Sequence, residues 1–168
     1  MDPKSGEVVL AEITENSKGD AQVAEDMMNS VPQSVQNIYG DGAYDSIGLR
    51  RKIHSRGAKP KIPPPRNAAV NREASDEAAL ERNHAIQAIK GLGGDDSARS
   101  LWKKLTGYHR RSLVETTMFR YKQIFGGLLR SRSWANQKIE AILKCQILNR
   151  MTRLGMPVGV WEAIEVGG

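Results

Sequence analysis

Two acidic residues lie in positions where carboxylates commonly do chemistry. Asp41 stands between Gly40 and Gly42, just after a segment with strand character, and Glu115 belongs to a long segment with helical periodicity. Open α/β sheets bind ligands at the carboxyl ends of their strands, although an Asp between two glycines is more often only a turn residue. Two carboxylates beside cations are what a two-metal phosphoryl-transfer site requires, because oxygen ligands hold Mg²⁺.

Three further side chains share one side of the helix expected around Glu115. At about 100° per residue, this arc of roughly 60° contains Tyr108, Arg111, Glu115 and Lys122. It borders the apolar positions predicted to face the core, which are Val114, Met118, Tyr121, Phe125 and Leu128. The simplest interpretation is an Arg111–Glu115 ion pair, which stabilises a helix by about 0.2–0.5 kcal/mol. The alternative is that the phenol and the two cations hold a phosphate strand against the acid.

Charge is distributed unevenly along the 168 residues, whose formal net charge is +6. Residues 99–153 contain 13 Lys or Arg and 2 Asp or Glu, whereas residues 1–48 contain 2 and 9. A basic block of this size is typical of proteins that contact phosphate backbones, and the alternative is a solvated basic helical surface. A hydrophobic content of 39% and a mean hydropathy of −0.50 argue against a membrane protein and against a fully disordered one.

Cysteine and histidine give no sign of another chemistry. The single Cys145 cannot form an internal disulfide, and the first residues lack the pattern of a signal peptide, so we expect a cytoplasmic protein. His54, His84 and His109 lack the spacing of metal ligands. We expect them to lie in the core or to face phosphates.

An alternation of strands and helices has to position Asp41. The pattern predicts a turn at 3–6, strands at 7–14, 34–39 and 59–62, and helices at 20–28, capped by Asp20, and 46–55. This order indicates an α/β layer with at least one parallel strand pair. Pro63-Pro64-Pro65 ends the layer, because prolines cannot donate to a strand ladder.

The second half of the chain is predicted to be helical. Helices are expected at 78–89, 98–105, 108–129 and 135–154, and Gly155-Met156-Pro157 stops the last one. We therefore divide the chain into a strand and helix layer (1–62), a Pro-rich linker (63–75), a helical part (76–157) and a tail (158–168).

Together these residues resemble bacterial insertion-sequence transposases of the DDE class. The spacing Tyr108-x2-Arg111-x3-Glu115-x6-Lys122 matches their Tyr-Arg-Glu-Lys signature. Three other segments, at 40–45, 62–64 and 148–151, resemble the family in the same order. Four motifs in order are far more specific than one, and they extend over nearly the whole chain.

The resemblance implies an RNase H-like fold, incomplete at its N-terminal edge and followed by a helical C-terminal half. It implies that Asp41 and Glu115 are the second and third catalytic acids and ligands of Mg²⁺ or Mn²⁺. Tyr108, Arg111 and Lys122 would bind the DNA strand near the scissile phosphate. The family hydrolyses a phosphodiester at each element end, and the freed 3′-hydroxyl then attacks target DNA. Implied partners are double-stranded element ends, target DNA and further copies of the chain, in the nucleoid.

One catalytic acid of the family has no counterpart here. The first Asp lies on the opening strand in the family, whereas Asp2 fits the turn at 3–6. We therefore expect a transposase fragment that is inactive alone, with a two-metal site only in a completed domain. The missing sheet edge predicts marginal stability or aggregation. Two alternatives stay open: an inactive DNA-binding remnant or regulator, and an unrelated basic helical protein that binds RNA or has a structural role.

Overall fold

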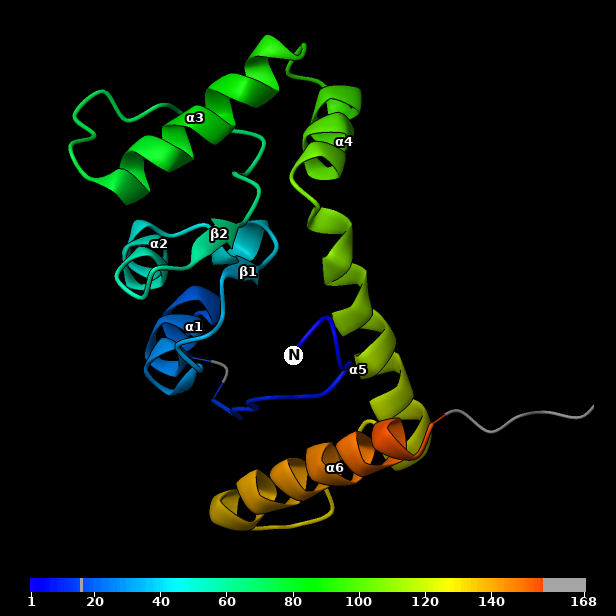
Figure 1. Ribbon diagram of the computed structural model, residues 1–168. Coiled ribbons are helices and arrows are strands. Elements are labelled where there is room, and N and C mark those ends of the chain that lie inside the picture. Colours follow the sequence, from blue (N-terminus) through cyan, green and yellow to red (C-terminus); the bar gives the residue numbers. More distant parts are fainter. Residues whose placement is uncertain (16, 156–168) are drawn as a thin grey trace, which may run out of the picture.

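The computed structural model describes residues 1–15 and 17–155, which form helices around a small parallel sheet (Figure 1). The helices are α1 (Asp20–Met27), α2 (Ile47–His54), α3 (Glu77–Gly91), α4 (Asp96–Leu105), α5 (Ser112–Phe125) and α6 (Trp134–Leu154). The strands are β1 (Asn37–Tyr39) and β2 (Lys59–Lys61). Three 3-10 turns are η1 (Met28–Ser30), η2 (Gly42–Tyr44) and η3 (Tyr108–Arg111). The predicted tail and the helix stop at Met156-Pro157 lie outside the described residues.

The predicted parallel strand pair is confirmed. Ile38 of β1 lies opposite Pro60 of β2, and α2 provides the crossover between the two strands. β1 is shorter than the predicted strand at 34–39, because the N–H of Val35 donates to the carbonyl of Pro32 in a turn. The predicted helices at 20–28 and 46–55 are confirmed as α1 and α2, although Gly19 rather than Asp20 is the N-cap of α1.

A small apolar core lies between α1, α2 and the sheet. Its buried members are Met28, Leu49, Ile53, Ala58 and Ile62. Leu49 and Ile53 are four residues apart on α2 and therefore share its inner face. This core fixes β1, and with it the segment that carries Asp41, against α2.

Residues 7–14 form no strand, so the strand predicted there is wrong. The N–H of Val8 donates to Asn149 Oδ1 at 2.7 Å, and Asn149 Nδ2 donates to the Val8 carbonyl at 2.9 Å. A strand needs a partner backbone, and here the side chain of an α6 residue takes that place. Figure 1 shows this segment running from the side of α5, along α6, toward α1.

The predicted turn in front of this segment is confirmed. The N–H of Asp2 donates to the Glu7 carbonyl at 2.9 Å, and the Asp2 carboxylate accepts the N–H groups of Lys4 and Ser5. Hydrogen bonds to these groups lower the pKa of Asp2. Asp2 is therefore a turn residue, as the sequence pattern predicts.

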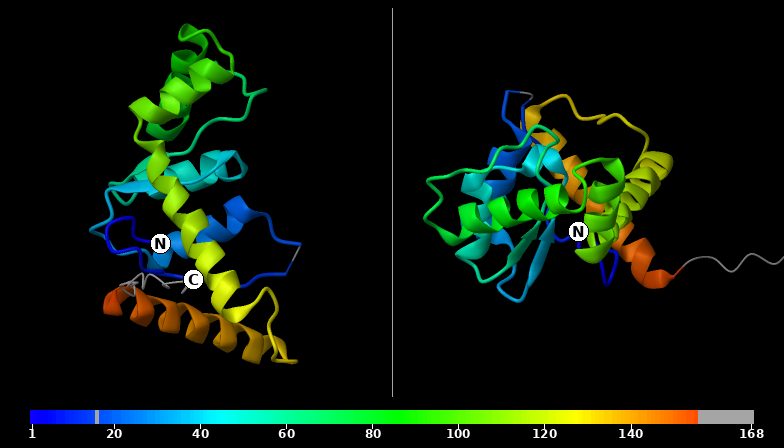
Figure 2. Two further views of the ribbon diagram at one scale, coloured as in Figure 1. Left: turned by 90° about the vertical axis from the view of Figure 1, so that its right-hand side faces the viewer. Right: turned by 90° about the horizontal axis from the view of Figure 1, so that it is seen from above.

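The helical half matches three of its four predicted helices. Those at 78–89, 98–105 and 135–154 appear as α3, α4 and α6. The helix predicted at 108–129 is instead the 3-10 turn η3 followed by α5, which ends at Phe125 because Gly126 adopts φ 77°. Figure 2 shows α5 running from the α3–α4 end of the molecule down to α6.

The apolar positions of α5 do not form the predicted buried seam. Val114 and Met118 are 42% and 49% exposed, and Leu128, which lies beyond the end of α5, is 83% exposed, whereas Thr117 is buried. Periodicity gives only the angles between side chains, and burial depends on which elements pack against the helix. In the described chain, Thr117 contacts the N-terminal residue Met1 instead, with 2.8 Å between the hydroxyl oxygen and the sulfur.

None of the described helices combines the length and the apolar character needed to cross a bilayer.

Candidate functional site

The two predicted catalytic acids meet at a single guanidinium. Arg111 Nη2 donates to Asp41 Oδ2 at 2.9 Å, and Arg111 Nη1 donates to Glu115 Oε1 at 2.6 Å. The guanidinium is a rigid planar group, so its two outer nitrogens hold the two carboxylates close to each other. Asp41 and Arg111 are 70 positions apart in the sequence. The fold therefore joins the end of β1 to the start of α5.

Asp41 owes its position to the turn that follows β1. It is the N-cap of η2, and its Oδ1 accepts the N–H of Ala43 at 2.9 Å, so that Oδ2 is the oxygen facing Arg111. The preceding Gly40 is buried, and a Cβ there would lie 3.1 Å from the Cβ of Tyr44. A larger residue would therefore require the Tyr44 side chain to shift by a few tenths of an ångström. The interpretation of Asp41 as a turn residue is correct, and it does not compete with a role in a site.

Glu115 and Arg111 are positioned by the start of α5. Gly107 adopts φ 70° and begins η3, whose last residue, Arg111, is the N-cap of α5. Glu115 lies in the first turn, where the helix dipole favours a negative charge. The predicted ion pair between the two residues is confirmed, and the side chains of Asp41, Arg111 and Glu115 are 39%, 29% and 63% exposed.

Two phenols border this charge cluster. Burial is the main cause that raises the pKa of Tyr108 and that of Tyr44. Nearby carboxylates, including Asp41, raise both pKa values further, and Arg111 lowers them in part. Burial is the largest single effect on the pKa of Arg111 and lowers it. The effects of Tyr108, Asp41 and Glu115 together outweigh burial, so the pKa is raised overall. Both phenols therefore stay protonated at neutral pH and can donate a hydrogen bond. Sequence reasoning identified Tyr108 and missed Tyr44, which stands three residues after Asp41.

Lys122 lies apart from this cluster. It is exposed on α5, two helical turns or about 10 Å beyond Glu115. No ion pair joins it to another residue of the described chain. The structure thus brings together four of the five predicted residues, Asp41, Glu115, Tyr108 and Arg111, and leaves Lys122 at a distance along the same helix.

A buried charge cluster anchors the segment that carries Asp41. The side chain of Asp45 is fully buried, and its two oxygens accept from Arg50 Nε and Arg82 Nε, each at 2.9 Å. Arg50 is only 1% exposed and also donates to the Ile62 carbonyl at 2.7 Å. Asp45 ends the turn η2, so this cluster fixes the turn to α2, to α3 and to the end of β2. Sequence analysis missed it, since a lone acid four residues after Asp41 carries no spacing signal of its own.

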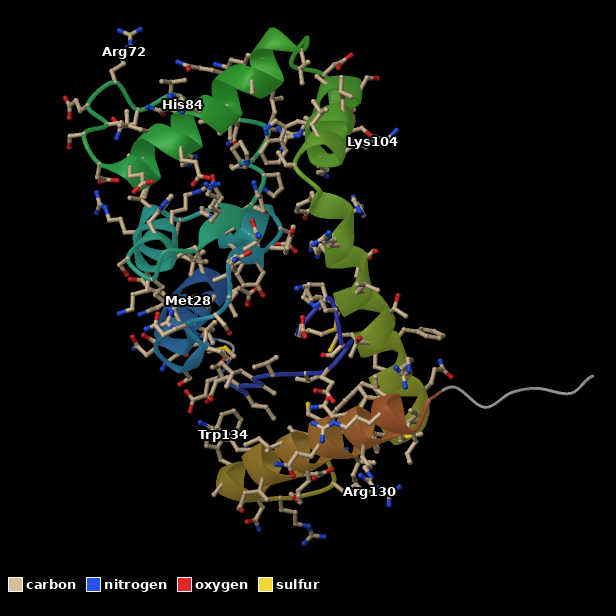
Figure 3. The ribbon with its side chains drawn as sticks, in the orientation of Figure 1. Met28, Arg72, His84, Lys104, Arg130 and Trp134 are labelled. Carbon is tan, nitrogen blue, oxygen red and sulfur yellow. The ribbon has the colours of Figure 1, made fainter. Side chains whose placement is uncertain are left out.

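The histidines and the cysteine have other surroundings. His54 is half-buried and its Nε2 lies 2.7 Å from Glu81, which links α2 to α3. His84 is exposed on α3 (Figure 3), and His109 is exposed in η3. Cys145 is half-buried on α6, where burial raises the pKa of its thiol.

The cluster at Arg111 is chemically suited to a hard cation. Asp41 and Glu115 offer carboxylate oxygens, the ligands preferred by Mg²⁺ and Mn²⁺. In the part of the chain that the structure describes, no three or more His, Cys, Asp or Glu side chains are grouped as metal ligands. At this cluster the described residues offer two carboxylates, Asp41 and Glu115, and both are paired with Arg111.

Several basic side chains of η3 and α4 are exposed. Arg110 and His109 are exposed in η3, and Lys104 projects outward from the neighbouring α4 (Figure 3). Such side chains favour contact with a polyanion.

Comparison with known proteins identifies the family of the chain. No solved structure matches the chain. The family model described as the transposase DDE domain matches residues 1–150, a span that contains both carboxylates and Arg111. The chain therefore belongs to the transposase DDE domain family.

Proposed function

We propose that this chain is part of an insertion-sequence DDE transposase, with an RNase H-like fold in which Asp41 and Glu115 are the second and third catalytic acids. The observation that carries this proposal is the shared guanidinium of Arg111, which joins an acid at a strand end to an acid on a distant helix. Such a pair has little use as a stabilising contact, because exposed ion pairs contribute about 0–1 kcal/mol.

The substrate we infer is double-stranded DNA, at element ends and at the target. A divalent cation held by Asp41 and Glu115 would assist the attack of water or of a 3′-hydroxyl on a phosphodiester. Arg111 and Lys122 carry the charges that bind the backbone, and Tyr108 donates a hydrogen bond to a phosphate oxygen. These groups recognise phosphates rather than bases, so they position a strand without selecting its sequence.

A second candidate is a DNA-binding protein without catalysis that regulates transposition. The observation that favours it is that, among the described residues, the cluster at Arg111 contains two carboxylates, whereas DDE chemistry uses three. We infer that the 168-residue chain alone is inactive, and that it acts when another segment supplies the third acid. Assembly of several copies on DNA, in the nucleoid, fits either candidate.

The purified chain and a labelled duplex test both candidates. We expect fluorescence anisotropy to show binding that weakens steeply as salt rises, and we expect no Mg²⁺-dependent nicking. In a protein completed by fusion to a segment bearing the first acid, Glu115→Gln should abolish nicking and keep DNA affinity. Absence of DNA binding would refute both candidates, whereas nicking by the chain alone, lost in Glu115→Gln, would refute its inactivity.

A further inference from the structure

We propose that Arg111 couples metal binding to DNA binding at this site. Without DNA its guanidinium pairs with both Asp41 and Glu115 and competes with a divalent cation for their oxygens. A DNA phosphate takes over the guanidinium and releases the carboxylates to the cation. This inference rests on the proposed function of Asp41 and Glu115 as metal ligands.

Three of the four carboxylate oxygens of Asp41 and Glu115 are already engaged by described residues. Asp41 Oδ2 accepts from Arg111 and Oδ1 accepts from the backbone of Ala43, while Glu115 Oε1 accepts from the other outer nitrogen of Arg111. A cation that binds between the two acids must therefore displace Arg111. A positive charge at the same place also repels the cation.

The geometry of Arg111 favours exchange of its partners. A guanidinium binds phosphate with the same forked N–H groups that it uses for carboxylates. Its side chain is 29% exposed, so a phosphate can reach it without unfolding of η3.

Thermodynamic linkage makes the coupling reciprocal. If DNA raises the affinity of the site for a cation by a given factor, the cation raises the affinity for DNA by the same factor. The cation then binds mainly when the DNA strand is in place, and the acids stay paired when it is not.

Mn²⁺ binding to the full chain, followed by electron paramagnetic resonance with and without a short duplex, tests this coupling. We expect DNA to strengthen Mn²⁺ binding by the wild-type chain. Arg111→Gln should strengthen binding without DNA roughly five- to thirtyfold, as expected when two exposed ion pairs of up to about 1 kcal/mol each are removed. DNA should then add little. Arg111→Lys, which keeps the charge but loses the fork, should give a smaller increase.

Arg110→Gln is the matched control. It removes the same charge one residue away, at an exposed side chain that no ion pair joins to the described residues, so it should retain the effect of DNA. Circular dichroism checks that each variant folds like the wild type.

Asp41→Asn separates failure of this inference from failure of the proposed function. Mn²⁺ binding that depends on Asp41 but is the same in wild type and both Arg111 variants, with or without DNA, overturns the coupling and leaves the metal site. Mn²⁺ binding that is absent throughout, or indifferent to Asp41→Asn, overturns both.

Discussion

Replacement of Asp45 by Asn should destabilise the protein more than any surface substitution. The Asp45 side chain has no exposed area and lies between the guanidinium groups of Arg50 and Arg82, each 2.9 Å away. Arg50 is 1% exposed, so it has no access to water that could replace the carboxylate. The amide of Asn keeps the shape and one accepting oxygen but removes the charge.

The expected size follows from the burial of the pair. Removing one partner of a buried ion pair typically costs about 3–5 kcal/mol, since the other charge is left uncompensated. Domains are stable by about 5–15 kcal/mol in total. With a urea dependence of about 2 kcal/mol per molar, a loss of about 4 kcal/mol lowers the unfolding midpoint by roughly 2 M.

Urea unfolding followed by circular dichroism measures this loss. Arg51→Gln is the control, because the Arg51–Asp76 pair joins the same two helices, α2 and α3, but its side chains are 62% and 37% exposed. That variant should lose less than about 1 kcal/mol. Equal, small losses in Asp45→Asn and Arg51→Gln would refute the assignment of Asp45 as a buried anchor. A variant without any cooperative transition would mean that the cost exceeds the whole stability.

Three further predictions concern α5, α6 and their connection. Asn149→Ala removes both hydrogen bonds to the extended N-terminal segment, so amide exchange there should accelerate, with a loss of about 1–3 kcal/mol in unfolding free energy; unchanged exchange would contradict this. Lys122→Ala should reduce the slope of log affinity for DNA against log salt by about one, and an unchanged slope would exclude a phosphate contact. Hydrogen bonds from Lys144 and from two backbone N–H groups lower the pKa of Glu140 to about 2 from 4.5. The stabilising contribution of ionised Glu140 is therefore complete above pH 4.5 and is lost as pH falls through about 2. The chemical shift of the Ser131 amide, which donates to Glu140, should titrate near pH 2. A midpoint near 4.5 would show that these hydrogen bonds to Glu140 do not form.

Local patterns predicted the elements that depend on local interactions. Ser46 caps α2 with its hydroxyl at 3.1 Å from the N–H of Leu49, and Asp76 caps α3 in the same way. Both signals are visible in the sequence, and both helices were predicted within a few residues. The strand predicted at 7–14 failed because a strand is defined by its partner. No periodicity reveals that the side chain of Asn149 occupies that position.

The site was predicted for a different reason. Asp41 was singled out by its place after a strand, and Glu115 and Arg111 by their shared helix face, but only the resemblance to a family gave them catalytic and DNA-binding roles. Periodicity alone favoured only the local Arg111–Glu115 ion pair. That pair is present, but Arg111 also binds Asp41 from a distant segment. A helical wheel cannot predict the contact between Arg111 and Asp41, since it describes one helix at a time. Asp45 was missed for the same reason, because its partners come from α2 and α3.

The two charge clusters differ in burial, and this difference separates their roles. Asp45 is fully buried, and exchange of its guanidinium partners for water or metal would require the fold to open. Asp41 and Glu115 are 39% and 63% exposed, so their guanidinium can be exchanged at little cost. The buried anchor Asp45 lies only four positions after the exposed acid Asp41. The turn η2 can therefore hold Asp41 in place while its partner changes, as the proposed exchange of the guanidinium for a cation requires.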